Sequence, residues 1–394
     1  MSAPESDLVV AARSVDRDVI ELRREIHADP ELGLQLPRTQ QRILESLTGL
    51  GLDVTLGEST TSVVADLDTG RDGPTILLRG DMDALPLTED TDEPFASTLE
   101  GHMHACGHDS HVAMLAGAAK LLSDNRSELR GRIRFMFQPG EEGHHGARYM
   151  IEEGLLDGVD RAFAVHVDTN QTAGSILCRG GPMFASSDEL HVEVTGKGGH
   201  AASPHFARDP ITAAAAMVGA FHTMLTREVA AFDPAVVTIA HINGGTTNNI
   251  IPETATMEGT IRAFSEHTRT QVHESIGRVA SGVAETHGCS CSVDIVKGYP
   301  VTVNDPAMVD LVRQMTDETL GAGNYIAAPN PDMAAEDFAY VLQQVPGAIM
   351  SLGACPDDVD DPRAAPALHS NQMVLNETVL HRGVAMYAAM AITS

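Results

Sequence analysis

The sequence predicts an α/β protein in which a larger domain is interrupted by a smaller inserted domain. In the first and last parts of the chain, short apolar runs alternate with helical stretches, a pattern typical of a mixed central sheet flanked by helices. Between them, the order strand, helix, strand, strand, helix, strand is typical of a ferredoxin-like unit. A chain of 394 residues is also long enough for two domains. We therefore expect a discontinuous α/β domain at 1–184 and 299–394, with an inserted α+β domain at 185–298.

The discontinuous domain is expected to begin with one amphipathic helix over 7–29. Apolar residues recur there at helical spacing and the pattern stops at Asp29 and Pro30. The apolar runs that follow are short enough for buried strands. The predicted strands are 62–67, 75–78, 133–137 and 162–165, with a helix at 112–122.

The inserted domain is expected to begin near Ser187, where the pattern of apolar residues changes. Beyond Pro300 the alternation of helix and strand resumes. The elements predicted for the insertion are strands 190–194, 235–242, 254–264 and 291–296 and helices 210–227 and 267–287, followed outside it by a strand at 348–352 and a closing helix at 378–390.

The charge and composition of the chain limit its partners. Because 55 acidic residues face 26 basic ones, the net charge of -29 repels nucleic acid. No stretch approaches the roughly 20 apolar residues that span a bilayer, and the start lacks the pattern of a secretion signal. The five cysteines show no spacing typical of a disulfide framework. We therefore expect a cytoplasmic protein with neither a nucleic acid nor a membrane as partner.

Three predicted strands run directly into residue types that bind metals in proteins. In open α/β sheets such groups collect at the carboxyl ends of the strands, so we expect these clusters to meet at one edge. The clusters are Asp81 and Asp83 after the first strand, Glu141 and Glu142 after the second, and His166 after the third.

A fourth cluster, at 101–111, lies just before the predicted helix and contains Cys106 and His108. A thiolate at a helix N-terminus suits a metal site, because the helix dipole lowers the pKa of the thiol. Mixed thiolate, imidazole and carboxylate ligands indicate zinc or a neighbouring first-row ion and not magnesium or calcium. Taken singly, His102 and His111 fit a surface or hydrogen-bonded histidine better than a ligand.

The adjacent carboxylates Glu141 and Glu142 can divide two tasks. One can bind metal while its neighbour takes a proton from a water molecule and hands it to a leaving amine. A pair of glutamates is more often a solvated turn. Here the Pro-Gly turn after a buried-looking strand favours the catalytic interpretation.

One sequence feature keeps an oxidoreductase as an alternative. The stretch 196–201 follows a predicted strand and matches a loose dinucleotide fingerprint. However, His200 stands where a pyrophosphate would bind, and no clear ribose-binding acid follows. The sequence contains no His-Glu-x-x-His helix, phosphate-binding loop or Gly-x-Ser-x-Gly elbow either, so a metal-dependent hydrolase is favoured.

Several segments together resemble the dinuclear-metal aminoacylases and carboxypeptidases. They are similar to the amidohydrolase branch, which includes hippurate hydrolases, auxin-conjugate hydrolases and N-acetyl-diaminopimelate deacetylases, and the resemblance covers nearly the whole chain. The segments that carry it are 23–33, 81–86, 104–109, 138–142, 198–205, 249–252 and 335–338.

The resemblance implies two divalent metal ions per subunit, zinc, manganese or cobalt, with Cys106 bridging them. It also implies that Glu141 is the general base and that Asp83 orients a ligand. Many relatives carry a metal-binding histidine at the position of Asp81, which leaves open whether Asp81 contacts metal here. The implied ligands are Cys106, His108, Glu142, His166 and His369.

The resemblance further implies that the discontinuous domain is the catalytic, metal-binding domain and that the inserted domain is a lid that forms homodimers or larger homo-oligomers. His200 and Asn249 would stabilise the oxyanion, reaching in from the partner subunit, and Arg262 would bind the substrate carboxylate. The alternative for Arg262 is a surface arginine on a strand.

The expected reaction is hydrolysis of the amide bond of a small N-acyl amino acid that carries an acetyl, benzoyl or similar acyl group. Glu141 would activate the attacking water and then protonate the leaving amine, while His200 holds the oxyanion. A dipeptidase or carboxypeptidase is the alternative enzyme. A non-catalytic metal-binding or ligand-binding protein on the same scaffold is a remote one.

Overall fold

The computed structural model describes residues 6–393, which divide into two compact units. The first unit contains residues 6–183, 303–330 and 337–393, and the second contains 184–302 together with Pro331–Glu336. Residues 1–5, which belong to the start considered above for a secretion signal, lie outside the described part. None of the described helices is both long and apolar enough to cross a membrane.

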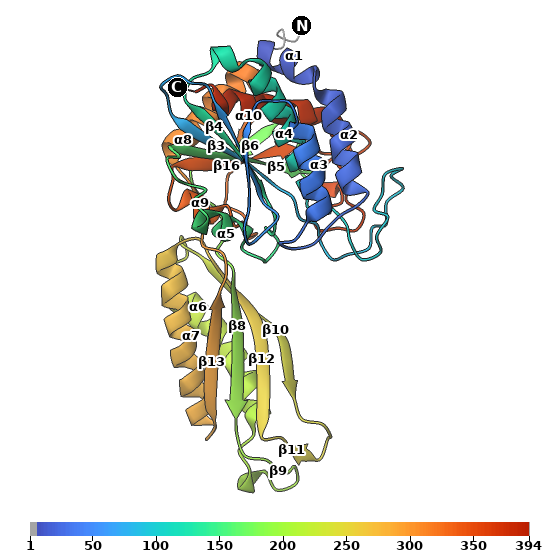
Figure 1. The fold of residues 1–394 in the computed structure, drawn as a ribbon. Helices are drawn as coiled ribbons and strands as arrows, with labels where there is room; N and C mark the ends of the chain where they lie inside the picture. The colour runs from blue at the N-terminus through green and yellow to red at the C-terminus, as the bar shows by residue number, and fades with distance from the viewer. Residues whose placement is uncertain (1–5, 394) are drawn as a thin grey trace. The chain divides into compact units, whose positions relative to one another are not determined.

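A mixed sheet of eight strands forms the centre of the first unit, in the order β1-β2-β4-β3-β5-β16-β6-β15 (Figure 1). β3, β4 and β5 are parallel neighbours, so their carboxyl ends share one edge and the predicted meeting of the three clusters is confirmed. The strands are β1 (Asp53–Leu56), β2 (Val63–Asp68), β3 (Thr75–Asp81), β4 (Arg132–Gln138), β5 (Arg161–Asp168), β6 (Ile176–Cys178), β15 (Tyr325–Ala327) and β16 (Gly347–Gly353).

Helices cover this sheet and bury its apolar residues. α4 and α10 pack against each other and against β3 and β5, while α2 packs on α4 and α8 on β16 (Figure 1). The helices of this unit are α1 (Asp7–Arg13), α2 (Asp16–His27), α3 (Pro37–Leu47), α4 (His108–Asp124), α5 (Gly146–Glu152), α8 (Pro306–Thr319), α9 (Ala339–Leu342) and α10 (Leu380–Ala391), with short 3₁₀ turns at Arg126–Glu128, Pro362–Ala364 and Glu377–Val379.

The prediction of one helix over 7–29 is wrong, because the segment forms two helices that meet at Ser14 and Val15. The Ser14 hydroxyl donates to the carbonyl of Ala11 at 2.6 Å. The backbone N–H groups of Ser14 and Val15 bond three residues back, which tightens the chain and ends the first helix. Because the apolar residues keep helical spacing across Ser14 and Val15, the sequence pattern did not indicate the break.

α4 starts at His108, four residues before the predicted start, and two glycines permit this position. Gly107 caps the helix with a φ of 81°, and a β-carbon there would lie 2.3 Å from Val167. A β-carbon on Gly80 would lie 2.8 Å from the carbonyl oxygen of His111. The first turn of α4 therefore approaches both β5 and β3 closely.

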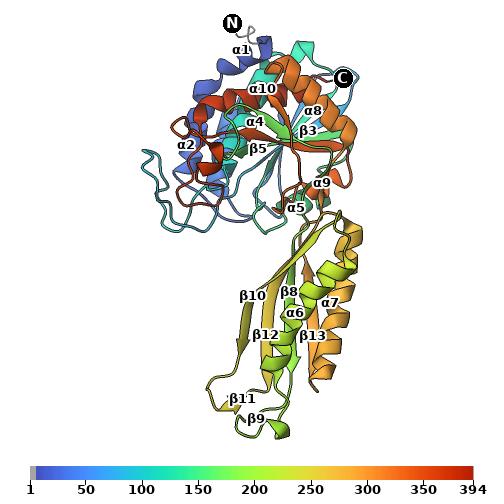
Figure 2. The ribbon, with the colours of Figure 1, turned by 180° about the vertical axis from the view of Figure 1, so that it is seen from behind.

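The second unit has the ferredoxin-like order that the sequence predicts. Its antiparallel sheet runs β10-β12-β8-β13, and α6 and α7 lie side by side over one face of it (Figure 2). The elements are β8 (Asp188–Thr195), α6 (Pro210–Glu228), β10 (Ala235–Gly244), β12 (Thr254–Ala263), α7 (Glu266–Thr286) and β13 (Ser290–Lys297), and strands β7 (Gly181–Phe184) and β14 (Thr302–Asn304) lie where the chain passes between the units.

A second, two-stranded sheet in this unit was not predicted. It pairs β9 (Gly199–His200) with β11 (Ile250–Ile251). After β9 comes only the 3₁₀ turn Pro204–Phe206, and α6 starts at Pro210. A dinucleotide fingerprint requires a glycine loop that opens directly into a helix, so this structure rejects the oxidoreductase alternative.

Candidate metal centre

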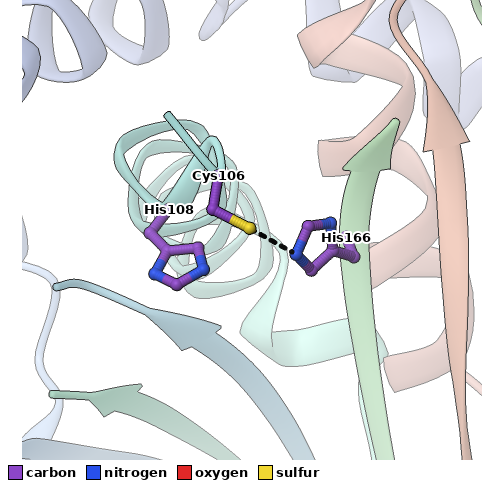
Figure 3. A group of neighbouring side chains, drawn as sticks. All are labelled: Cys106, His108 and His166. Carbon is purple, nitrogen blue, oxygen red and sulfur yellow. Dashed lines mark hydrogen bonds between the residues drawn. The ribbon is translucent and has the colours of Figure 1, made fainter. Parts of the chain in front are cut away.

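Cys106, His108 and His166 lie together at the carboxyl edge of the large sheet (Figure 3). Cys106 immediately precedes the N-cap of α4, and its sulfur points to the imidazole of His166 on β5. The Cys106 Sγ lies 3.5 Å from Nε2 of His166. A thiolate and an imidazole bound to one tetrahedral zinc ion would stand about 3.6 Å apart. The spacing of these two donors therefore fits a shared metal ion.

The orientation of His166 is fixed by the backbone of its own strand. Its Nδ1 lies 2.7 Å from the carbonyl oxygen of Val167. A carbonyl oxygen only accepts, so Nδ1 donates to it and Nε2, the nitrogen that faces Cys106, is the one left to bind a metal ion. Histidines that bind metals are commonly oriented by such a bond on the other ring nitrogen.

A second group of potential ligands shares Cys106 with the first. It joins Cys106 to Glu142 and His369, with Nε2 of His369 3.1 Å from Oε1 of Glu142. The shared thiolate is the arrangement that a bridge between two ions requires. In this second group, His369 is held at a left-handed φ of 68°, where its N–H donates to the carbonyl of Ala105 at 2.7 Å.

The ionisable groups of the two sets shift each other's pKa. Burial would raise the pKa of the Cys106 thiol, but His166 and His108 lower it to about 6. Burial would lower the pKa of His166, yet the charge on Cys106 raises it to about 9. Hydrogen bonds with Cys106 and Glu142 raise the pKa of His369 to about 10. These groups therefore favour the thiolate, the form of cysteine that binds metals.

His108 is fully buried, and neither of its ring nitrogens makes a hydrogen bond of good geometry within the described residues. Nε2 lies 3.3 Å from Oδ2 of Asp81, and Nδ1 lies 3.5 Å from Oδ1 of Asp83. Buried imidazoles are normally hydrogen-bonded. Because both nitrogens of His108 lie this far from their nearest protein partners, the residue is suited to bind a metal ion.

Glu141 stands at the end of β4 in a turn that Asp83 holds. The two carboxylate oxygens of Asp83 accept the backbone N–H groups of Glu141 and Glu142, each at 3.0 Å. Oε1 of Glu141 accepts the N–H of Asp337 at 3.3 Å. Because Glu141 has ligand atoms close to both His108 and Glu142, it lies beside the candidate centre, where a general base is needed.

Asp81 is engaged by protein groups on both of its oxygens. Oδ2 forms an ion pair with Arg79 at 2.7 Å, and Oδ1 lies in a hydrogen bond with Nδ1 of His111 at 2.5 Å. Arg79 is itself buried and also bonds to Gln138 and Asp337. The sequence interpretation missed this network. Its available signal was an arginine at the end of an otherwise apolar strand, since a buried charge needs a partner.

The remaining predicted site residues belong to the second unit. His200 and Asn249 line one hollow of about 570 Å³ around β9 and β11, so the structure brings these two together. Nδ1 of His200 accepts the N–H of Ala202 at 3.0 Å. Arg262, on β12, is not among the residues that line the hollow and donates to the carbonyl of Met333 at 3.3 Å. The roles expected for these three residues stay predictions.

One set of potential ligands joins a thiolate to two imidazoles, and the other joins the same thiolate to a carboxylate and an imidazole. Together with a further glutamate beside them, they are typical of the class of metal-dependent hydrolases. The model of the peptidase family M20/M25/M40 matches residues 77–393, and the chain belongs to this family. The resemblance to the dinuclear-metal aminoacylases and carboxypeptidases is thereby confirmed, together with the prediction of a hydrolase of the metallopeptidase and amidohydrolase type.

Relatives of the chain include enzymes of two kinds. It is 39% identical to an N-acetyl-L-cysteine deacetylase of Bacillus subtilis, over 87% of this chain and 82% of the relative. It is 37% identical to thermostable carboxypeptidase 2 of Saccharolobus solfataricus, over 96% of both chains. A crystal structure of a dinuclear metal binding peptidase of the M20 family from Bacillus subtilis matches with a TM-score of 0.85 at 32% identity, covering 96% of this chain and 98% of the other.

Proposed function

We propose that this protein hydrolyses the amide bond of small N-acyl amino acids with the help of two divalent metal ions. The observation that carries the proposal is the pair of ligand groups that share Cys106, with Glu141 beside them. The similarity to a deacetylase of N-acetylcysteine supports the substrate class. The ligands would be Cys106, His108, Glu142, His166 and His369.

Bound zinc, manganese or cobalt would polarise the amide carbonyl and lower the pKa of a coordinated water molecule. The residues of the chain supply the proton transfers and the geometry. Glu141 accepts the proton of the attacking water and delivers it to the nitrogen of the leaving amine. Asp83 keeps Glu141 and Glu142 in place by accepting both of their backbone N–H groups.

We also propose that the second unit completes the site in a homodimer. His200 and Asn249 are exposed and share one hollow, so they are available to a second subunit, where they would donate hydrogen bonds to the oxyanion. Arg262 would bind the carboxylate of the substrate, because a guanidinium matches a carboxylate with two parallel bonds.

Mixing two inactive variants tests whether His200 acts on the partner subunit. Glu141→Gln and His200→Ala homodimers should each be almost inactive. After subunit exchange, a mixed dimer should regain activity in one of its two sites, up to about a quarter of the wild-type value if exchange is random. Molar mass by light scattering checks the dimer. Activity that stays absent in mixed dimers would place His200 in its own subunit's site.

A carboxypeptidase or dipeptidase is the second candidate, and the similarity to a thermostable carboxypeptidase favours it as the alternative.

A cytoplasmic location is part of the first proposal. All five cysteines are described, and none of them forms a disulfide, as expected in a reducing compartment.

The deciding experiment measures amine release from N-acetyl, N-benzoyl and indole-acetyl amino acids and from simple dipeptides. Metal-loaded and chelator-treated protein are compared side by side. We expect chelator-sensitive release from at least one N-acyl amino acid. Release from dipeptides alone would establish the peptidase alternative, and no release with any metal would favour a non-catalytic binding protein.

A further inference from the structure

His111 lies in the first turn of α4, and its fully buried ring lies next to two of the proposed ligands. The ring centroid of His111 is 4.4 Å from that of His166 and 5.5 Å from that of His108. A histidine so close to the candidate centre could be a ligand or could hold the ligands in place. Its hydrogen bonds distinguish these two roles.

Both ring nitrogens of His111 are occupied by protein groups. The backbone N–H of Val167 donates to Nε2 at 2.9 Å. Because a backbone N–H can only donate, Nε2 is unprotonated and the proton resides on Nδ1. Nδ1 then donates to Oδ1 of Asp81 at 2.5 Å. A neutral imidazole of one tautomer therefore has no lone pair left for a metal.

Each of these two bonds leads to a different proposed ligand. Val167 directly follows His166, and its carbonyl oxygen orients the His166 ring at 2.7 Å. Asp81, at the other end, has its second oxygen 3.3 Å from Nε2 of His108. His111 thus links the strand that carries His166 to the carboxylate that faces His108.

We propose that His111 is a positioning residue that orients His166 and His108 for metal binding without binding metal itself. This inference rests on the proposed metal site. A side chain that cannot form both bonds would leave the buried Val167 N–H or the buried Asp81 carboxylate without a hydrogen bond. Val167 or Asp81 would then move to find another partner, and this movement would displace His166 or His108 from the geometry that metal binding requires.

The shape of the side chain allows each bond to be tested separately. His111→Asn keeps a donor close to the position of Nδ1 and loses the acceptor for Val167. His111→Gln keeps an acceptor that can reach the Val167 N–H and loses the donor to Asp81. His111→Phe removes both bonds while filling the same space. Ser110→Ala is the matched control, since this neighbour on α4 is also buried and its hydroxyl has no described hydrogen-bond partner.

The experiment titrates each metal-free protein with Co²⁺ against a chelator and records the visible spectrum, in which thiolate and imidazole ligands give distinct bands. We expect His111→Phe to bind Co²⁺ between 10-fold and 100-fold more weakly and with a shifted spectrum. His111→Asn and His111→Gln should each lose less than His111→Phe, and Ser110→Ala should match the wild type. Melting of the metal-free proteins identifies any variant that fails to fold.

Several outcomes would overturn the inference. Unchanged Co²⁺ affinity and spectrum in folded His111→Phe would show that His111 positions nothing. Loss of one whole ion in both His111→Asn and His111→Gln would make His111 a ligand. A wild-type protein that binds no Co²⁺ would instead overturn the proposed function itself and this inference with it.

Discussion

Each of the two units contains a buried cluster of ionisable side chains, and the clusters differ in how well their polar atoms are matched. In the second unit, Asp188 receives Arg269 on both oxygens at 2.5 and 2.9 Å, and also His273 at 2.7 Å and the N–H of Gly298 at 3.0 Å. In the first unit, the imidazole of His108 lies 3.3 and 3.5 Å from its nearest carboxylates.

This difference distinguishes a cluster that stabilises the fold from a cluster that can bind a ligand. A buried ion pair with every oxygen hydrogen-bonded satisfies itself, and it joins the start of β8 to α7 and to the residue that follows β13. The buried imidazole of His108 has no good partner on either nitrogen within the described residues, so it requires something further to bind. Both clusters contain histidines and carboxylates, so residue type alone does not distinguish them.

The largest expected effect comes from removing the proton acceptor beside the first cluster. Glu141→Gln should lower kcat between 10²-fold and 10⁴-fold, because an amide cannot accept and deliver the proton. The bound metal and the melting temperature should stay as in the wild type. Steady-state kinetics together with metal analysis measure both quantities.

The control for Glu141→Gln is Glu152→Gln, which changes an exposed carboxylate on α5 that pairs with Arg148. This variant should keep wild-type turnover. If Glu141→Gln retained turnover within tenfold of the wild type, Glu141 would not be the general base.

Breaking the second cluster should affect stability and leave metal binding intact. Asp188→Asn leaves Arg269 buried without its full partner, which we expect to cost about 3 kcal/mol of unfolding free energy. Urea unfolding measures this cost, and hydrogen exchange of β8 and α7 shows whether it falls on the second unit. Asp294→Asn, at an exposed position of β13, should be nearly neutral. A lowered metal content in folded Asp188→Asn would mean that the two clusters are not separate.

Acidification should remove the stabilisation due to Asp188. Burial would raise the pKa of this carboxyl, but His273 and Arg269 lower it from 3.8 to about 2. A carboxyl whose pKa is depressed in the folded protein contributes full stability above its unfolded value. The difference in unfolding free energy between the wild type and Asp188→Asn should therefore be constant above about pH 5 and shrink as the pH falls from about 4 towards 2. A difference that grew over this range would contradict the assignment.

The smallest expected effect concerns the backbone of His369. A residue with a β-carbon in the left-handed region is strained by about 1 kcal/mol, which glycine avoids. Both His369→Gly and His369→Ala should weaken metal binding. In metal-free protein, His369→Gly should be about 1 kcal/mol more stable than His369→Ala. Equal thermal stability of the two variants would show that the residue carries no strain.

The sequence by itself determined the architecture and the residue types of the candidate site. Alternation of apolar runs placed the parallel strands, and the clusters after β3 and β4 and at His166 therefore came to one edge. The order of elements also identified the ferredoxin-like unit. These features depend on local periodicity and on the fixed direction of parallel strands, which a sequence displays directly.

Only the tertiary structure decided which polar groups meet. Arg79 bonds to Asp337, 258 residues away, and His111 joins Asp81 to the backbone of Val167. Asp188 and Arg269 are 81 residues apart, so the sequence did not reveal that they form a buried, fully hydrogen-bonded ion pair. Such contacts are set by how closely packed elements approach one another, as Gly80 and Gly107 allow for α4. Because no local pattern encodes that approach, the sequence could name His111 but could not distinguish a buried positioning residue from a histidine at the surface.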